Sequence, residues 1–441
     1  SSAASDVYKR QSVGSAQRMK DVAKLITDGE QKIVVLSAMS GTTNTLVEIS
    51  DYLYKKNPEG ANEVINKLEA KYKQHIEELY STEEYKQKTL EFVKSVFDYI
   101  RSYTKDIFTL FEEKVILAQG EIISTNMVTN YLCEQGVKAT LIPALEFMRT
   151  DKNSEPDLTY IREKLAIQLE ANPDYEIYIT QGFICRNAYG EIDNLQRGGS
   201  DYTASLIGAA VNASEIQIWT DIDGMHDNDP RIVDKTSPVR QLHFEEAAEL
   251  AYFGAKILHP TCVQPAKYAN IPVRLLNTME PTAPGTLISN ETEKGKIKAV
   301  AAKDNITAIK IKSSRMLLAH GFLRKVFEIF ESYQTAIDMV CTSEVGVSMS
   351  IDNTKHLNEI VDDLKKYGTV TVDHDMCIVC VVGDLEWENV GFEAKALDAM
   401  RDIPVRMISF GGSNYNISFL IREADKKKAL QSLSDALFNN K

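Results

Sequence analysis

The sequence predicts an α/β protein with a mostly parallel sheet, followed by two smaller βαββαβ units. Short apolar runs alternate with helical stretches through the first two thirds, and polar loops containing glycine follow several of these runs. Such alternation is typical of a doubly wound sheet, with helices on both faces. In the last third, Gly321-Phe322 recurs as Gly391-Phe392, 70 residues later, which predicts two copies of one smaller fold.

The first clear strand is expected over Lys32 to Leu36. It leads into a polar loop, Ser37 to Asn44, and then into a helical stretch. The hydroxyl groups and the glycine of this loop either cap the helix or contact a ligand, and capping alone would explain Thr43 or Asn44.

From Gly60 to about Ala118 the chain is charged and rich in tyrosine, with apolar residues at heptad-like spacing. This pattern predicts a helical subdomain with a solvated, charged face. We assign no chemistry to it.

Gly120 to Thr125 follows a helical stretch and places Glu121 among apolar residues. A glutamate in this position either starts a helix or contacts a ligand. Because Arg197 is present elsewhere in the sequence, Glu121 becomes a candidate for binding the ammonium group of a ligand. Strands near Thr140 to Ile142 and Glu176 to Thr180 then bracket a helix at roughly Leu158 to Leu169.

The most informative segment is Arg197 to Ala204, in which an arginine and two glycines precede an acid that opens an apolar helix. We expect that helix over Asp201 to Ala213. The N–H groups at its start favour a negative charge, the glycines allow close approach, and Arg197 can bind a carboxylate or phosphate with two hydrogen bonds. A pair of tight turns is the alternative, but turns do not require the arginine. The segment therefore predicts a site for an anionic ligand.

Glu215 to Trp219 is typical of a short buried strand, and Thr220 to Gly224 follows it. Asp221 and Asp223, at the carboxyl end of this strand, can hold a ribose, a magnesium ion or the turn itself.

Gly254 to Pro260 follows a helix rich in Ala and Glu. Lys256 suits a nucleotide phosphate and equally suits the end of a helix dipole. His259 precedes a proline and is expected to pack or cap rather than act as a base. A strand over Pro272 to Leu276 and the turn residues of Pro281 to Gly285 mark the exit from the first domain.

The repeat includes a second pair of landmarks, because Val345 to Ser348 recurs as Tyr415 to Ser418 at the same spacing. Each copy is expected to contain a strand, Gly-Phe, a helix, two strands joined by a tight turn and a closing helix. The closing helices are predicted over Thr354 to Lys366 and Glu423 to Phe438.

Composition limits the classes of function. The 441 residues leave room for two or three domains, and 44% hydrophobic with 26% charged residues is ordinary for a globular protein. The absence of an apolar run of about eighteen residues argues against a membrane span. A net charge of -13 argues against a general nucleic-acid surface. Anionic substrates must therefore be held by local positive groups.

The six cysteines are scattered, and no signal peptide is recognisable, so a reducing cytoplasm is expected rather than a disulfide scaffold. Cys377 and Cys380 form a lone CxxC inside the apolar run Met376 to Val382. We interpret them as part of a buried strand and not as a zinc or redox site.

Several segments resemble the matching motifs of aspartate kinase: Ser37 to Asn44, Gly120 to Thr125, Arg197 to Ala204, Thr220 to Gly224 with Asp229 to Arg231, and Gly254 to Pro260. The repeat resembles the paired ACT domains of that family. The resemblance runs from about Ser12 to the C-terminus. The pattern is most similar to the monofunctional, lysine-inhibited type, because Met316-Leu317, Gly321 to Leu323 and Thr342 to Val345 resemble its first ACT unit.

The resemblance implies a doubly wound amino-acid-kinase domain over residues 1–295 and tandem ACT domains over 296–441, with a strand near 297–303 completing the second unit. It implies transfer of the γ-phosphoryl group of MgATP to the β-carboxylate of L-aspartate. The product, 4-phospho-L-aspartate, opens the route to lysine, threonine and methionine. Inhibition by lysine and a homodimer joined through the ACT domains are also implied.

Site residues follow from the resemblance position by position. In the aspartate site, Arg197 would bind a carboxylate and Glu121 the amino group, together with Ser37, Thr43, Gly198, Gly199 and Ser200. The ATP contacts would be Thr220, Asp221, His226, Arg231 and Lys256, with Asp201 and Lys256 as the catalytic pair. The lysine site would comprise Met316, Ala319, Phe322, Leu323, Ala336, Ile337, Asp338, Ser343 and Glu344. No separate metal site is expected, because Mg²⁺ would arrive with the nucleotide. Such chemistry needs mainly positioning and charge neutralisation, so no histidine base is required.

Two positions depart from the family pattern. His226 stands where a tyrosine is common. The family also opens with Lys-Phe-Gly-Gly-Thr-Ser-Val, of which Ser12 and Val13 remain here. We therefore expect residues 1–11 to be foreign or mistranslated and to form no strand, and we expect the chain as written to have weak or no kinase activity.

Other function classes remain open at this point. A kinase for glutamate or a nucleotide would share the fold without the joint Arg197 and Glu121 pattern. An amino-acid sensor without kinase activity would keep the repeat and lose the N-terminal loop.

Overall fold

The computed structural model describes residues 4–8, 14–105, 107–195, 199–255, 258–314 and 320–438. These residues form two compact units. The first comprises Ser1–Met225 with Ile257–Asn290, and the second His226–Lys256 with Glu291–Lys441. The predicted boundary at residue 295 stays a prediction.

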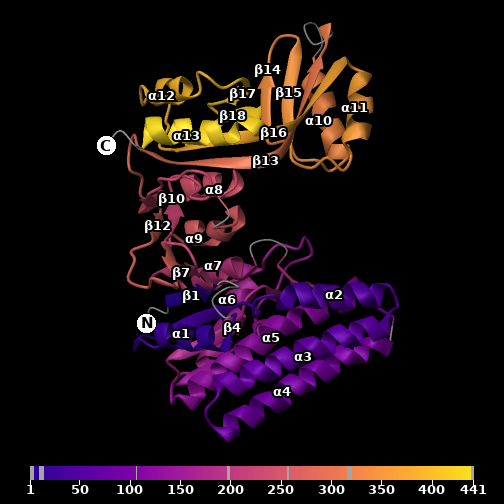
Figure 1. The fold of residues 1–441 in the computed structure, drawn as a ribbon, viewed down its shortest axis with the longest axis vertical. Helices are drawn as coiled ribbons and strands as arrows, with labels where there is room; N and C mark the ends of the chain where they lie inside the picture. Colours follow the sequence, from indigo (N-terminus) through magenta and orange to yellow (C-terminus); the bar gives the residue numbers. More distant parts are fainter. Residues whose placement is uncertain are drawn as a thin grey trace. The chain divides into compact units, whose positions relative to one another are not determined.

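The first unit contains a central sheet and a set of long helices (Figure 1). Its strands are β1 (Ala4–Tyr8), β2 (Lys32–Leu36), β3 (Ala139–Leu141), β4 (Ile177–Gln181), β5 (Ile184–Arg186), β6 (Ile192–Asn194), β7 (Ile216–Thr220), β11 (Val273–Asn277) and β12 (Thr286–Ser289). Its helices are α1 (Ala16–Ile26), α2 (Thr42–Tyr54), α3 (Pro58–Leu79), α4 (Glu83–Ser102), α5 (Leu110–Glu134), α6 (Leu158–Glu170), α7 (Gly199–Val211) and α9 (Gln264–Tyr268). Short 3₁₀ turns lie at Tyr103–Lys105, Ala144–Glu146 and Pro260–Val263.

The sheet of this unit includes the order β12-β11-β7-β1-β2-β4-β3. Every neighbouring pair from β11 to β3 is parallel, and β12 runs antiparallel to β11. The expectation of a mostly parallel sheet is therefore confirmed.

Strand β1 corrects one expectation from the sequence. Residues 1–11 were expected to form no strand, yet Ala4–Tyr8 pairs with both β2 and β7. A strand between two neighbours is held by backbone hydrogen bonds on both sides, and these need no apolar side-chain pattern. The missing hydrophobic periodicity was therefore a poor guide at this position.

Helices cover both faces of the sheet. All five residues of β2 are buried, so each face of this strand is covered. Val34 and Leu36 share one core cluster with residues of α1, α2, α3, α4 and α5. Helix α7 packs on β1, β2 and β7 and contacts α6 and α9. Because successive strand residues alternate between faces, Ile33 and Val35 point to the opposite side from Val34.

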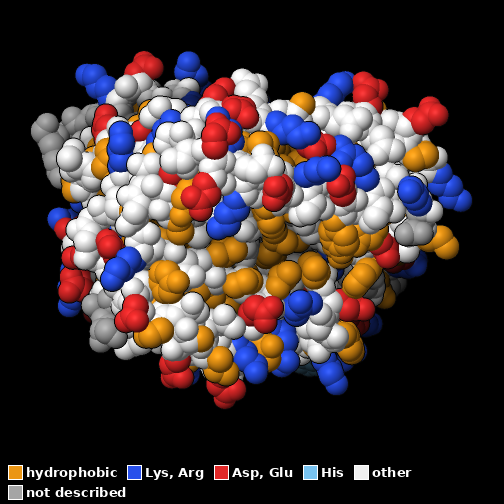
Figure 2. Space-filling model, turned by 90° about the horizontal axis from the view of Figure 1, so that it is seen from below, with side chains coloured by type: hydrophobic (Ala, Val, Ile, Leu, Met, Phe, Trp, Pro, Cys, Tyr) orange, Lys and Arg blue, Asp and Glu red, His pale blue; other side chains and the backbone are white. Residues whose placement is uncertain are grey.

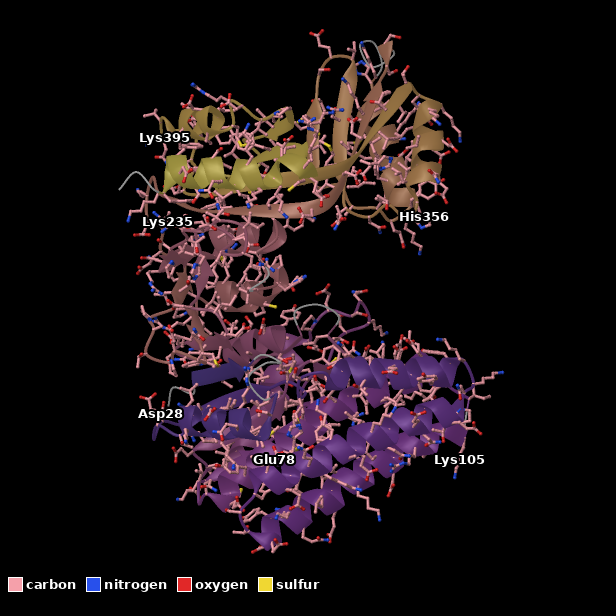
Figure 3. The ribbon with its side chains drawn as sticks, viewed as in Figure 1. Asp28, Glu78, Lys105, Lys235, His356 and Lys395 are labelled. Atoms are coloured by element: carbon pink, nitrogen blue, oxygen red, sulfur yellow. The ribbon has the colours of Figure 1, made fainter. Side chains whose placement is uncertain are left out.

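The charged segment after residue 57 is helical, as predicted. Helices α3, α4 and α5 lie side by side, with α2 along one flank (Figure 1). A polar contact joins this region to α1: Lys20 Nζ of α1 donates to the Glu78 carbonyl oxygen of α3 at 2.9 Å. Lys32, buried at the start of β2, donates to Asp28 at 2.6 Å; Asp28 and Glu78 are labelled in Figure 3.

The second unit is built on a six-stranded antiparallel sheet in the order β14-β15-β13-β16-β18-β17. The strands of this sheet are β13 (Ile297–Lys312), β14 (Met339–Thr342), β15 (Gly346–Ile351), β16 (Thr369–Gly383), β17 (Val405–Ser409) and β18 (Asn416–Arg422). The second unit also contains the short strands β9 (Pro238–Val239) and β10 (Gln241–His243), and β8 (Met225–His226) leads into the unit. Its helices are α8 (Phe244–Tyr252), α10 (Phe322–Ser332), α11 (Leu357–Lys365), α12 (Phe392–Ala399) and α13 (Lys426–Leu437), with a 3₁₀ turn at Glu423–Asp425.

The 70-residue repeat is visible in this sheet. Each copy has a glycine with positive φ before its helix, Gly321 at 86° and Gly391 at 93°. Each long strand also carries a non-glycine residue with positive φ at the equivalent place, Asn305 at 58° and Asp375 at 54°. Cys377 and Cys380 lie buried within β16, as expected for a core strand.

Acidic and basic side chains are interspersed over the face seen in Figure 2, with hydrophobic side chains gathered in its middle. Across the described ranges, no helix combines the length and the apolar character that crossing a membrane would need. The cytoplasmic location stays a prediction.

Candidate functional site

The parallel strands of the first unit end at the same level. Tyr8 of β1 pairs with Leu36, Leu36 with Gln181, and Thr220 with Asn277. The loops that follow β2, β4 and β7 therefore gather at one edge of the sheet. In open α/β sheets this carboxyl edge is where ligands bind.

Ser37 and Glu121 meet at this edge. Glu121 is 2% exposed, and its Oε1 accepts a hydrogen bond from the Ala38 backbone N at 3.3 Å. Ser124, one turn further along the same helix, donates to the Ser37 carbonyl oxygen at 2.7 Å. The hydroxyl of Ser37 is buried and has no hydrogen-bond partner within the described ranges. The loop after β2 is thus fixed to α5 beside a buried carboxylate.

Gly120 makes this approach possible. A Cβ atom at this residue would lie 2.9 Å from the Ala38 Cβ and 3.2 Å from the Thr42 Cγ2. Any side chain would push α5 away from the loop. Of the two alternatives for Glu121, the helix start is wrong, because Gly120 and Glu121 lie in the interior of the 25-residue helix α5.

Helix α7 begins against the end of β4. A Cβ at Gly182 would lie 2.5 Å from the Ser200 Cβ and 2.7 Å from its Cα. The Gly182 N donates to the Leu36 carbonyl oxygen at 2.9 Å, which joins the ends of β4 and β2. The structure therefore brings Gly199 and Ser200 to the same edge as Ser37 and Glu121.

Asp201 lies in the first turn of α7 and is 6% exposed. A carboxylate in this position is stabilised by the N–H groups and dipole at the helix start. Thr43 is the second residue of α2, at the end of the loop that begins with Ser37.

Gln181 is a residue that the sequence analysis did not single out. Its Nε2 donates to the Thr125 Oγ1 at 2.9 Å, and its Oε1 accepts from the Ala144 N at 2.7 Å. It ties β4 to α5 from within the core. A glutamine at the end of a buried strand, directly before a glycine, was the signal in the sequence.

The turn after β7 is held by Thr220. Its hydroxyl accepts from the Ile222 N at 3.1 Å, and its carbonyl oxygen accepts from the Thr278 N at 2.8 Å. Asp221 is exposed in that turn. The local geometry matches a strand end built to present backbone and carboxylate groups.

His226 and Arg231 belong to the second unit. His226 Nδ1 lies 2.9 Å from the Thr236 hydroxyl. Arg231 is exposed and binds Asp229 through two nitrogens, at 2.9 and 2.6 Å. Hydrogen bonds from Arg231, against a smaller cost of burial, hold the pKa of Asp229 below its usual range.

A second polar cluster surrounds Asp338, directly before β14. Its side chain is 2% exposed, and Oδ1 accepts from Lys303 Nζ and from the Tyr252 hydroxyl, each at 2.8 Å. Oδ2 is buried and has no partner in the part of the chain that the structure describes. Burial, followed by the hydrogen bond to Asp338, raises the pKa of Tyr252 to about 12. Burial alone would lower the pKa of Lys303, but Asp338 and Asp352 outweigh it and raise that pKa.

The other candidate effector residues lie around the same repeat copy. Phe322 is buried at the start of α10, and Leu323 beside it is exposed. Ala336 and Ile337 lead to Asp338, whereas Ser343 and exposed Glu344 form the turn after β14. Five candidates lie outside the described residues: Arg197, Gly198, Lys256, Met316 and Ala319.

Comparison with known proteins decides the family. The model of the amino acid kinase family matches residues 11–277, and a model of the ACT domain matches residues 379–437. Aspartokinase 1 of Arabidopsis thaliana, a chloroplast protein, is 34% identical over 97% of this chain and 79% of its own length. The lysine-sensitive aspartokinase 3 of Escherichia coli is 31% identical over 94% of each chain.

The chain belongs to the aspartokinase family.

It is therefore an ATP-dependent kinase. The aspartokinase fold agrees with this assignment. The crystal structure of E. coli aspartokinase III in complex with aspartate and ADP superposes with a TM-score of 0.84, at 30% identity, over 99% of this chain and all of that one. The expected fold, an amino-acid-kinase domain followed by ACT units, is confirmed. The comparisons do not support the alternative of an amino-acid sensor without kinase activity.

Proposed function

We propose that this aspartokinase transfers the γ-phosphoryl group of ATP to the β-carboxylate of L-aspartate, giving 4-phospho-L-aspartate. The observation that carries the proposal is the buried Glu121 carboxylate against the loop after β2, at the carboxyl edge of the sheet where α7 also begins. An amino acid with two carboxylates needs one negative group for its ammonium and several donors for its acids. This edge supplies both kinds of group.

In the proposed aspartate complex, Glu121 accepts from the substrate ammonium. The hydroxyls of Ser37 and Thr43, the backbone of Gly198, Gly199 and Ser200, and the guanidinium of Arg197 bind the carboxylates. The orphaned Ser37 hydroxyl supports this arrangement, because a buried hydroxyl without a partner costs free energy until a ligand satisfies it. The substrate carboxylate is already a nucleophile, so the residues position it and exclude water.

We place ATP on Thr220, Asp221, His226, Arg231 and Lys256. The turn held by Thr220 offers backbone groups, and Arg231, kept in one orientation by Asp229, offers a fixed cation. Lys256 would neutralise charge on the phosphates as they move. Asp201 would order the reacting groups around them.

Magnesium would bind together with the nucleotide. Within the described ranges no group of three His, Cys, Asp or Glu side chains is arranged to hold a metal ion. Mg²⁺ in kinases is usually held by one or two carboxylates together with phosphates and water, so a dedicated cage is not required. Buried Asp201 provides one such carboxylate. The ion supplies neutralisation of the phosphate charge when bound.

We further propose that L-lysine inhibits the enzyme by binding at Asp338. The E. coli relative is lysine-sensitive by name. Asp338 is a nearly buried acid whose Oδ2 has no partner in the described part of the chain, which suits an ammonium group. Phe322, Leu323 and Ile337 offer apolar surface for an alkyl chain, together with Met316, Ala319 and Ala336. Ser343 and Glu344 would contact the polar end. We expect a homodimer through the ACT units.

Coupled measurement of ADP release tests both proposals. Turnover should require aspartate as well as ATP and should fall when lysine is added. Asp338→Asn should retain turnover and lose the inhibition. Turnover that does not depend on aspartate would contradict the proposed substrate, and inhibition that survives in Asp338→Asn would contradict the proposed lysine site.

A further inference from the structure

Tyr72 connects the helical region to the loop of the proposed aspartate site. This residue lies on α3, and its side chain is 1% exposed. Its hydroxyl lies 2.8 Å from the Thr42 Oγ1, within hydrogen-bonding distance. Thr42 is the first residue of α2, directly before Thr43. Helix α3 packs against α2, and α2 also packs against α5 (Figure 1).

The surroundings of this hydrogen bond contain both sides of the site. Gly120 of α5 brings its backbone against the Thr42 side chain, and Glu121 follows it. Burial raises the pKa of Tyr72, the hydrogen bond with Thr42 lowers it by a smaller amount, and the negative charge of Glu121 makes a further, still smaller contribution that raises it. The phenol therefore stays protonated and lies close enough to Glu121 to sense its charge.

The neighbouring residue of α3 contacts the same loop. Lys71 Nζ donates to the Ser40 carbonyl oxygen at 3.2 Å. Two consecutive residues of one helix thus hold the turn from Ser40 to Thr42 from both ends. Neither contact is needed to close the core of α3, which is filled by apolar residues such as Ile65, Leu68 and Ile76.

We propose that Tyr72 is a positioning residue for aspartate binding. Its hydroxyl fixes Thr42, and through Thr42 it holds the loop from Ser37 to Thr43 at the distance from Glu121 that the substrate requires. Tyr72 acts through the loop and does not touch the reacting atoms. The inference rests on the aspartate site proposed above.

Steady-state kinetics of Tyr72→Phe test this role. Loss of one buried hydrogen bond to the loop should raise KM for aspartate about threefold to tenfold. KM for ATP and kcat should change little. Tyr80→Phe is the matched control: Tyr80 is also buried in the helical region, but its hydroxyl donates to the Met127 carbonyl oxygen at 2.7 Å. It should lower the melting temperature by a similar amount and leave KM for aspartate unchanged.

Thr42→Val provides a second test that does not disturb the aromatic core. It should raise KM for aspartate as Tyr72→Phe does, and the double variant should be no worse than either single one, because both remove the same bond. Equal KM values for wild type, Tyr72→Phe and Thr42→Val would overturn the inference. A wild type that turns over ATP normally but shows no dependence on aspartate would instead overturn the proposed function.

Discussion

At the scale of single residues, Glu121 gives the most direct test, because we propose that its carboxylate binds the substrate ammonium group. Glu121→Gln keeps the shape and the hydrogen bond to the Ala38 N but removes the charge. We expect kcat/KM for aspartate to fall roughly tenfold to hundredfold, the range for a charged hydrogen bond. ATP affinity should be retained.

Glu113→Gln serves as the control for that change. Glu113 lies on the same helix and accepts a hydrogen bond from the Tyr54 hydroxyl. Steady-state kinetics at saturating ATP should show wild-type kcat/KM for this variant. A Glu121→Gln enzyme that matches the control would remove Glu121 from the substrate site.

Glu246 of the second unit predicts a dependence of stability on pH. It is fully buried; Oε2 accepts from the His243 N at 2.8 Å, and Oε1 has no partner among the described residues. Burial raises the pKa of this carboxyl, against the lowering effect of the His243 hydrogen bond and Lys298. A raised pKa in the folded state favours the protonated form, so folding loses stability as pH rises above the unfolded value of about 4.3.

Glu246→Gln should therefore stabilise the protein at neutral pH. The gain should be on the order of 1 kcal/mol, and it should disappear below about pH 3, where Glu246 is protonated in both states. Thermal unfolding at several pH values measures it. A loss of stability that is the same at every pH would show that the carboxylate is well satisfied in the folded protein.

At the scale of elements, the contact between β4 and α7 predicts the effect of a single methyl group. Gly182→Ala would place a Cβ 2.7 Å from the Ser200 Cα, which is too close unless the start of α7 moves. We expect a loss of about 1 to 3 kcal/mol in the free energy of unfolding, as for overpacked cores. Activity should fall with it, because the same movement displaces Gly199 and Asp201. Gly190→Ala, where no atom lies within 4 Å, controls for general effects of the substitution, apart from the strain of its positive φ.

The contact between helix α8 and Asp338 should affect how tightly lysine binds. Tyr252 at the end of this helix donates one of the two hydrogen bonds that occupy Asp338 Oδ1. Tyr252→Phe removes that donor and leaves Oδ1 able to accept a hydrogen bond from the ammonium group of free lysine. Lysine should therefore bind about threefold to tenfold more tightly, the range for one hydrogen bond. Calorimetric titration measures the affinity. Tyr333→Phe, which loses a similar bond to Asp363, should leave lysine affinity unchanged.

The elements themselves could be predicted where their pattern was regular. Strand β2, the helices after residue 57 and the repeated units were all evident from apolar periodicity or from recurrence. Strand β1 was missed because its backbone partners lie far away in the sequence. A helix start at Glu121 stayed open as an alternative because nothing local indicates that α5 runs unbroken through Gly120.

The site was only partly predictable for a related reason. Local composition marked the loop that contains Ser37 and Thr43 and the helix start near Gly199, whereas their roles in binding rest on the family resemblance. Tyr72 could not be found in this way, because a tyrosine in an amphipathic helix looks like core until its partner Thr42 is known. Contacts between segments distant in the sequence carry no local signature.

At the scale of the whole molecule, the two compact units predict different responses to the effector. The chain has two tryptophans, and Trp219 lies in the first unit whereas Trp387 lies in the second. In Trp387→Phe, fluorescence reports on the first unit only, while circular dichroism reports on both. Lysine at about 100 times its dissociation constant should stabilise the unit that binds it by roughly 2.7 kcal/mol.

We therefore expect lysine to shift the circular dichroism transition more than the Trp219 fluorescence transition. Asp338→Asn should abolish the difference. Coincident shifts of both signals would show that the two units unfold as one cooperative body.

The ion pair between Lys303 and Asp338 has a consequence for the sensitivity of the enzyme. Under the proposed regulation, lysine binds at Oδ2 while the Lys303 ammonium group stays on Oδ1 of the same carboxylate. Two positive charges on one carboxylate repel each other, so the charge of Lys303 weakens the binding of free lysine. The position of one side chain on β13 would therefore set the lysine concentration at which the enzyme is inhibited.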